Sequence, residues 1–297
     1  MLLVGTGRGL VDLDSGKRII EGPAVTALAP GEAGGWYALL GRQSVVRLEK
    51  DGEAATPVAQ LPEPDGQSLA VLPDGTVVVG RTGARLAAIS VHGEVNDVPA
   101  FQAVPGREGW ENPANPTPDT RTMAAGTQRL WVNVHVGGVW WSGDGGRTWH
   151  AAVEPEADVH EVRTGAGGRV AVAAAAGFGW SDDGGQSWSW ATDGLHAHYL
   201  RAVALDGDMA FVSASDGPFT RGGAIYRSRL GAGFESCGTG LPYRFDGNVD
   251  SGHLDASGGR VAFSFAERVY ASEDRGQTWH VAAVSPEPVT AVRFTGD

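Results

Sequence analysis

The chain has 297 residues, 42% of them apolar, and a formal net charge of −12 at pH 7. The apolar content is enough for a sizeable core. The negative charge argues against nucleic acid and anionic membranes as partners, because both select for clustered Lys and Arg. The single cysteine, Cys237, excludes an internal disulfide.

No stretch of about 20 apolar residues is present that would cross a bilayer. The first residues, Met1 to Arg8, lack the basic region and long apolar segment of a signal peptide. We therefore expect a cytoplasmic protein with no membrane association.

Short alternating apolar runs, separated by turn residues, recur along the chain and predict β-strands. They fall into groups of four, at residues 25–61, 68–104, 120–153, 159–195, 199–241 and 249–284. The starting points lie about 39 to 52 residues apart, which matches the blade period of four-stranded propeller repeats. This spacing predicts six blades.

The two ends of the chain supply a seventh blade. Residues 289–297 contain one predicted strand, and residues 1–21 contain three. Pairing them closes the ring and removes two exposed sheet edges. We therefore predict an all-β fold, a single seven-bladed β-propeller over residues 1–297. The proline-rich segment 101–118 is longer than an ordinary connection, and we expect it to be an inserted functional loop.

One turn sequence, S-x-D-x-G-x-[ST]-W, occurs three times, at residues 142–149, 181–188 and 272–279. Its Asp and Ser side chains can bond amides of their own turn, Gly permits a positive φ, and Trp provides an apolar anchor. The motif resembles the Asp-box, or BNR repeat, of sialidases and many other β-propellers. The resemblance implies a propeller fold with each box in the last hairpin turn of its blade.

Polar residues concentrate in the loops expected on the face away from the boxes. Histidine is the commonest transition-metal ligand, and three donors can define an open site. We predict a metal site formed by His135, His160 and His196, with His198 or His253 as a possible fourth ligand. The alternative is that these histidines bond backbone carbonyls at the blade entrances.

Two arginines, Arg121 and Arg201, fall on predicted channel strands and are suited to clamp a carboxylate or phosphate. A neighbouring carboxylate can serve as general acid or base. The predicted catalytic residues are His160, Asp158, Arg201, Arg121 and Asp250. The predicted ligand-binding residues are Asn112, Asp119, Tyr199, Asn248 and Trp110, the last as a stacking or lid residue. The alternative interpretation is ion pairing between blades.

Sialidases use three arginines, an acid–base Asp and a Tyr activated by a Glu, so the resemblance implies a search for these groups. By location, Tyr199 and Glu161 are candidates for the Tyr–Glu pair, but the Arg-Ile-Pro typical of sialidases is absent. Segments 158–162, 194–203 and 247–250 are similar to bacterial proteins described as BNR-repeat or glycosyl-hydrolase-like.

Three functions remain open at this point. The first is a small-molecule site at the channel mouth opposite the boxes, in a His-metal-dependent enzyme acting on a small polar or anionic substrate. The second is a sialidase-like glycoside hydrolase. The third is a non-catalytic scaffold or assembly factor, which predicts an exposed apolar or aromatic patch.

Overall fold

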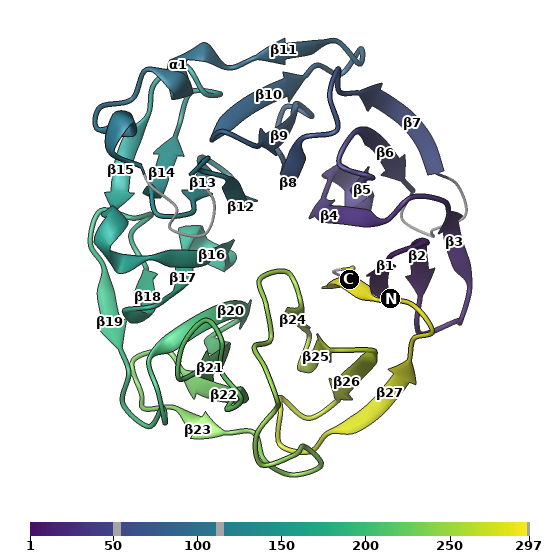
Figure 1. Ribbon diagram of the computed structural model, residues 1–297, viewed down its shortest axis with the longest axis vertical. Coiled ribbons are helices and arrows are strands. Elements are labelled where there is room, and N and C mark those ends of the chain that lie inside the picture. Colours follow the sequence, from purple (N-terminus) through teal and green to yellow (C-terminus); the bar gives the residue numbers. More distant parts are fainter. Residues whose placement is uncertain (50–54, 111–115, 296–297) are drawn as a thin grey trace.

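The alternating runs fold into seven four-stranded antiparallel sheets arranged as a ring (Figure 1). This computed structural model describes residues 1–49, 55–110 and 116–295. The predicted all-β, seven-bladed propeller is therefore confirmed. No helix in these described ranges is long and apolar enough to cross a membrane.

Six blades follow the chain order from the channel outward. The first three consist of β4 (Val25–Pro30), β5 (Trp36–Leu40), β6 (Ser44–Leu48) and β7 (Ala55–Gln60); β8 (Gly66–Val71), β9 (Val77–Arg81), β10 (Arg85–Ile89) and β11 (Val95–Asp97); and β12 (Thr120–Ala125), β13 (Leu130–Val134), β14 (Gly138–Ser142) and β15 (His150–Val153). The next three consist of β16 (Val159–Thr164), β17 (Val170–Ala174), β18 (Gly177–Ser181) and β19 (Ser189–Ala191); β20 (Tyr199–Asp206), β21 (Met209–Ser215), β22 (Ala224–Arg229) and β23 (Glu235–Ser236); and β24 (Leu254–Ser257), β25 (Arg260–Phe265), β26 (Arg268–Ser272) and β27 (His280–Val284). The described helical segments are short: α1 (Pro99–Gln102), η1 (Glu32–Gly34), η2 (Arg107–Gly109), η3 (Pro155–Ala157) and η4 (Ala166–Gly168).

The seventh blade joins the two ends of the chain, as the sequence predicted. Its strand order is β28 (Val289–Phe294), β1 (Leu2–Thr6), β2 (Gly9–Asp12) and β3 (Arg18–Glu21). In the β28–β1 pair, Leu3 lies opposite Arg293 and Val4 opposite Val292. Figure 1 shows β28 beside β1 on the channel side of the ring.

The core lies between neighbouring blades. For example, Val78 and Leu86 of one blade pack in one cluster with Met123 and Val132 of the next. The first strands of adjacent blades contact one another around the channel. Residues far apart in sequence can therefore meet along this channel.

The segment after β10 differs from its prediction. The predicted group at 68–104 placed its fourth strand at the end of that range, at 98–104. The fourth strand is instead β11, at Val95–Asp97, and the chain then turns into α1 at Pro99. Proline has no N–H for a sheet ladder and is favoured at the first helical position. The side chain of Phe101 is fully buried, with its ring centroid 4.6 Å from that of Trp149 in the next blade.

The segment before β24 also differs from its prediction. The first strand of this blade was expected from residue 249, but β24 begins at Leu254. The preceding residues turn at Gly252, whose φ of 83° suits glycine. Because residues 246–253 stay outside the sheet, they bring Asp250 to the channel mouth.

Each Asp-box turn is fixed by its own side chains. In the third box, Asp274 Oδ1 accepts hydrogen bonds from the amides of Gln277 at 3.0 Å and Thr278 at 2.9 Å. Its Oδ2 accepts the Thr278 hydroxyl at 2.6 Å, and the Ser272 hydroxyl accepts the Gly276 amide at 2.9 Å. The same contacts recur around Asp144 and Asp183.

These contacts give the box carboxylates a role in stability against acid. Hydrogen bonds from the hydroxyl and amide of Thr278 hold the pKa of Asp274 well below its usual range. A lowered folded-state pKa stabilises the fold above the ordinary carboxyl pKa, and this contribution is lost as the pH falls. As the pH falls from about 5 to about 2, we expect the free energy of unfolding to decrease less in Asp274→Asn than in the wild type. Urea unfolding across that range measures it, with the exposed Asp246→Asn as control. Equal pH slopes for Asp274→Asn and the wild type would contradict the assignment.

Candidate functional site

At the channel mouth away from the boxes, entry segments of several blades converge. Asp158 precedes β16, Tyr199 begins β20, and Asp250 precedes β24. The turn after β13 joins them, because the His135 amide donates to the Asp119 carbonyl, which precedes β12, at 3.0 Å. The box turn of that blade lies at the other end of β14.

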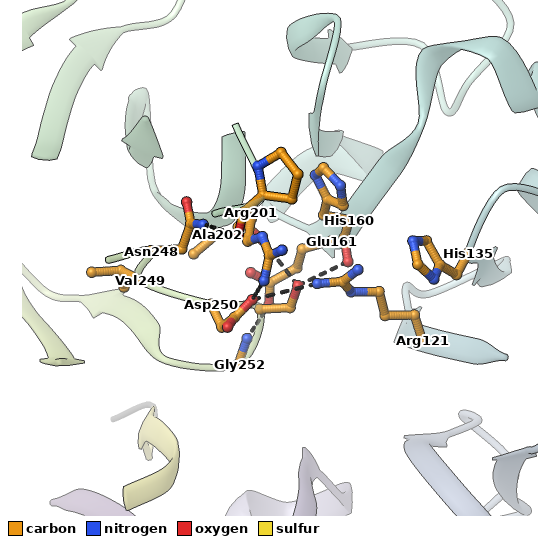
Figure 2. Close-up of polar contacts among 12 residues, drawn as sticks. Arg121, His135, His160, Glu161, Arg201, Ala202, Asn248, Val249, Asp250 and Gly252 are labelled. Atoms are coloured by element: carbon orange, nitrogen blue, oxygen red, sulfur yellow. Dashed lines mark hydrogen bonds and ion pairs between the residues drawn. The ribbon is translucent and has the colours of Figure 1, made fainter. Parts of the chain in front are cut away.

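Two arginines from different blades donate hydrogen bonds to one carboxylate oxygen. Asp250 Oδ1 accepts from Arg201 Nη1 at 2.6 Å and from Arg121 Nη2 at 3.4 Å (Figure 2). The Asp250 side chain is 45% exposed, whereas those of Arg201 and Arg121 are 18% and 21% exposed. Burial lowers the pKa of Arg121, and Asp250 partly opposes this effect. At Arg201, burial acts in the same sense, but the interactions led by Asp250 outweigh it and raise the pKa.

A histidine–aspartate pair lies beside this clamp. His160 is fully buried, and its Nδ1 must carry a proton because it donates to the Leu200 carbonyl at 2.6 Å. Its Nε2 lies 3.5 Å from Asp158 Oδ2. The close approach of the His160 ring, together with its charge, lowers the pKa of Asp158. The Asp158 backbone is left-handed, with φ of 47°, a conformation that is uncommon outside glycine.

Three buried polar atoms at this mouth have no hydrogen-bond partner within the described part of the chain. They are Nε2 of His160, Oδ1 of Asp158 and Nε of Arg201. Buried polar atoms are almost always hydrogen-bonded, and unmet ones require an explanation. Their concentration at one channel mouth indicates a place where a ligand can supply the missing contacts.

A buried carboxylate below the mouth connects the blades. Glu161 accepts hydrogen bonds from the amides of Val203 at 3.0 Å and Gly252 at 3.1 Å, and from Arg163 Nε at 2.9 Å. Arg293 lies 3.9 Å from it. Of this group, Glu161 was named from the sequence, but Arg163 and Arg293 were not. The signal in the sequence was the pair of opposite charges at positions 161 and 163, both on the first strand of one blade. A cavity of about 350 Å³ lies here, lined in part by Glu161, Arg293, Arg121 and Asp250.

Several of the predicted ligand residues also make contacts within the protein. Asn248 bonds the Ser215 hydroxyl and the backbone of the 217–218 loop. Asp119 accepts from Gln67 at 3.3 Å, and burial raises its pKa. Tyr199 packs against His160, with ring centroids 4.6 Å apart.

The expected loop residues have different outcomes. Trp110 was predicted to stack on a ligand, but it is only 6% exposed and packs between Phe101 and Trp140, because the 101–110 part of the loop closes over the core. Asn112 lies outside the described residues.

The three histidines predicted to bind a metal do not form one cluster. Both ring nitrogens of His196 are hydrogen-bonded: Nδ1 to the Tyr226 hydroxyl and Nε2 to the Gly222 carbonyl, each at 2.9 Å. The rings of His135 and His160 lie 6.4 Å apart, with Asp158 within 4.0 Å of Nε2 of each. In the described ranges, no group of three or more His, Cys, Asp or Glu is arranged to hold a metal ion.

Comparisons with known proteins identify the fold alone. No family model and no curated protein matches the chain. Among solved structures, the GH74 enzyme of Niastella koreensis aligns with a TM-score of 0.61 at 17% identity, over 88% of this chain and 47% of that one. The structure of YCF48 bound to a D1 peptide aligns with a TM-score of 0.61 at 15% identity, over 86% and 81%. U3-55K aligns with a TM-score of 0.63 at 11% identity, over 91% and 85%. This chain spans about half the length of the GH74 enzyme.

The Glu161 contacts predict a large stability effect. Glu161→Ala removes the acceptor of two backbone amides and leaves Arg163 and Arg293 short of a counter-charge. We expect the free energy of unfolding to fall by about 3 to 5 kcal/mol, measured by urea denaturation. The exposed Glu267→Ala should change it by less than about 0.5 kcal/mol. Similar effects of the two substitutions would show that Glu161 is not a structural centre.

The mouth also predicts an unusual histidine titration. Burial, followed by the charge of Arg121, lowers the pKa of His135 from 6.5 to about 4, against the opposing effect of Asp158. His135 is therefore neutral at pH 7, and its contribution to stability is complete above about pH 6.5 and lost as the pH falls toward about 4. Proton NMR of the imidazole should give this low pKa in the wild type and a higher one in Arg121→Gln, with His135→Ala identifying the signal. A pKa of His135 near 6.5 in the wild type would contradict this account.

Proposed function

We propose that the channel mouth binds a small molecule through a carboxylate or phosphate held by Arg121 and Arg201. The observation that carries this proposal is the convergence of both guanidinium groups on the single oxygen Asp250 Oδ1. Arginine presents a planar set of donors suited to such oxyanions. In this proposal Asp250 occupies the position that the ligand oxyanion takes when bound.

The position of Asp250 supports its replacement by a ligand. Its side chain is 45% exposed and belongs to the irregular segment before β24. Both arginines lie on first strands, β12 and β20, which hold them in place. In this proposal a ligand oxyanion reaches the two strand-borne arginines when Asp250, on its irregular segment, moves away.

The neighbouring His160–Asp158 pair supports an enzymatic role. The Leu200 carbonyl fixes a proton on His160 Nδ1, so Nε2 and the Asp158 carboxylate remain to share or transfer a second one. In this proposal the pair acts as acid–base group on a substrate anchored by the arginines. A metal ion held by His135, His160 and His196 is less well supported, since both nitrogens of His196 have other partners.

The sialidase-like alternative has less support. It requires a tyrosine activated by a glutamate, for which Tyr199 and Glu161 were the candidates. Both carboxylate oxygens of Glu161 already accept hydrogen bonds from backbone amides, and Oε1 also accepts one from Arg163. A more general glycoside hydrolase activity rests on the likeness to GH74 enzymes, which is a likeness of fold.

A second candidate function is binding of a protein partner, as the YCF48 structure with its peptide suggests for a related fold. The supporting observation is the exposure of Phe219 at 96% and Tyr243 at 86%. Their loops are joined by paired backbone hydrogen bonds between Gly223 and Phe245. Exposed aromatic side chains of this kind are enriched at protein interfaces.

The anion site predicts opposite effects of two substitutions. A panel of small carboxylates and phosphates is titrated by calorimetry at constant ionic strength. Arg201→Gln should weaken binding of the best ligand about 10-fold or more, because a bidentate charged contact is lost. Asp250→Asn should strengthen binding, because the internal competitor loses its charge.

The matched control is Arg221→Gln, which removes the same charge from an arginine whose side chain is 90% exposed. Equal weakening by Arg201→Gln and Arg221→Gln would indicate a nonspecific charge effect. That result, or an absence of binding throughout the panel, would overturn the proposal.

A further inference from the structure

A second cavity, of about 500 Å³, opens at the end of the ring that carries the boxes. Its lining residues belong to two blades, β12–β15 and β16–β19. These blades are neighbours in the ring (Figure 1). One wall is the 126–129 turn, and the other consists of the 164–169 turn and the box turn around Asp183. It is separate from the channel mouth, whose side chains belong to the opposite ends of these strands.

Arg129 in the first wall has an unusual environment. Its guanidinium carbon lies 3.8 Å from the ring centroid of Trp141, which fixes the plane of the group. Its Nη1 is buried and has no hydrogen-bond partner among the described residues. By contrast, Arg169 in the same cavity bonds Asp182 Oδ1 at 2.6 Å and the Gly207 carbonyl at 2.7 Å.

The carboxylates of the cavity wall are already engaged. Asp182 pairs with Arg169, and Asp183 accepts hydrogen bonds from two amides and two hydroxyls of its own box. The Ser187 hydroxyl and amide hold the pKa of Asp183 well below its usual range, so it remains an anion satisfied within the turn. Two arginines line the cavity, and Arg169 is paired with Asp182. In the described ranges, no carboxylate lies within ion-pair distance of Arg129.

The glycine next to Arg129 places no side chain against this buried nitrogen. A Cβ at Gly184 would lie 3.3 Å from Arg129 Nη1. The box does not require glycine here, because Arg275 occupies the same position of the third box with a φ of 58°, close to the 72° of Gly184. No side chain at position 184 therefore crowds Arg129 Nη1, a donor that lacks a partner among the described residues.

A second donor at this junction is also unmet. The indole nitrogens of Trp149 and Trp279 donate to their box carbonyls at 3.0 and 3.1 Å. That of Trp188 is buried without a partner among the described residues. Trp188 packs edge-on against Trp131, which lines the cavity.

We infer that this cavity is a second ligand site, which binds a small carboxylate or phosphate through Arg129. A buried charged donor without an acceptor is costly, and an oxyanion supplies the acceptor and the counter-charge together. The stacked guanidinium is held ready for a planar or tetrahedral oxyanion. This site does not depend on the function proposed for the channel mouth.

The test uses succinate and inorganic phosphate as separate probes, each balanced with sodium chloride to constant ionic strength. Tryptophan fluorescence of the full chain is titrated, because Trp141 lies against Arg129. The wild type should give a saturable change that is absent in Trp141→Phe. A response to succinate alone identifies a carboxylate site, and a response to phosphate identifies a phosphate site.

Two variants should weaken the response about 10-fold or more. Arg129→Gln removes the charged fork, and Gly184→Asn fills the space beside Nη1 with a residue that tolerates a positive φ. The matched control is Gly145→Asn, at the same position of the first box, where a Cβ would meet nothing within 4 Å. Gly145→Asn and the mouth variant Arg121→Gln should bind as the wild type does.

Equal responses in Gly184→Asn and Gly145→Asn would overturn the inference, as would a response that does not saturate. Loss of the response in Arg121→Gln would also overturn it, since the probe would then be binding at the channel mouth. Circular dichroism checks that each variant is folded. If Arg129→Gln does not fold, the Gly184→Asn and Gly145→Asn pair still decides the result.

Discussion

The pairing of β28 with β1 is the constraint on which the rest of the structure depends. It joins strands from the two ends of the chain and removes the two sheet edges that an open arc of blades would expose. Once the ring is closed, the first strands surround one channel. Arg121 and Asp250, which are 129 positions apart, then lie within hydrogen-bond distance. The site at the mouth is therefore a product of closure, because no short segment of the chain contains it.

Inside this channel the cost of buried charge decides which side chains are structural. Glu161 is 1% exposed and has acceptor contacts on both oxygens, so it joins neighbouring blades. Toward the mouth the contacts become incomplete, and buried atoms of Arg201, His160 and Asp158 lack hydrogen-bond partners in the described ranges. The same residue types thus hold the ring together at one depth and are available to a ligand at another. Their contacts, more than their charges, distinguish the two roles.

The strand period and box motif predicted the fold well, because both are local patterns that recur in every blade or in several. They also placed Arg121, Arg201 and Asp250 at one end of the ring. The site's details depend on contacts that a period does not describe. A register shift between Val159 and Glu161 interrupts the alternation of β16, so His160 and Glu161 are both buried. The path of an irregular loop decides that His196 meets Tyr226.

A repeated motif also provides its own reference within one chain. The three boxes share their turn contacts, so a difference at one position cannot be attributed to the requirements of the turn. Arg275 demonstrates that a side chain fits the position held by Gly184. The bonded indoles of the other two boxes likewise make the unmet nitrogen of Trp188 a property of its surroundings. The unmet indole nitrogen occurs at the junction that contains Arg129. A departure from a repeat that coincides with a buried, unsatisfied guanidinium nitrogen is better explained by a ligand than by the fold, since the fold is satisfied without it in the neighbouring copies.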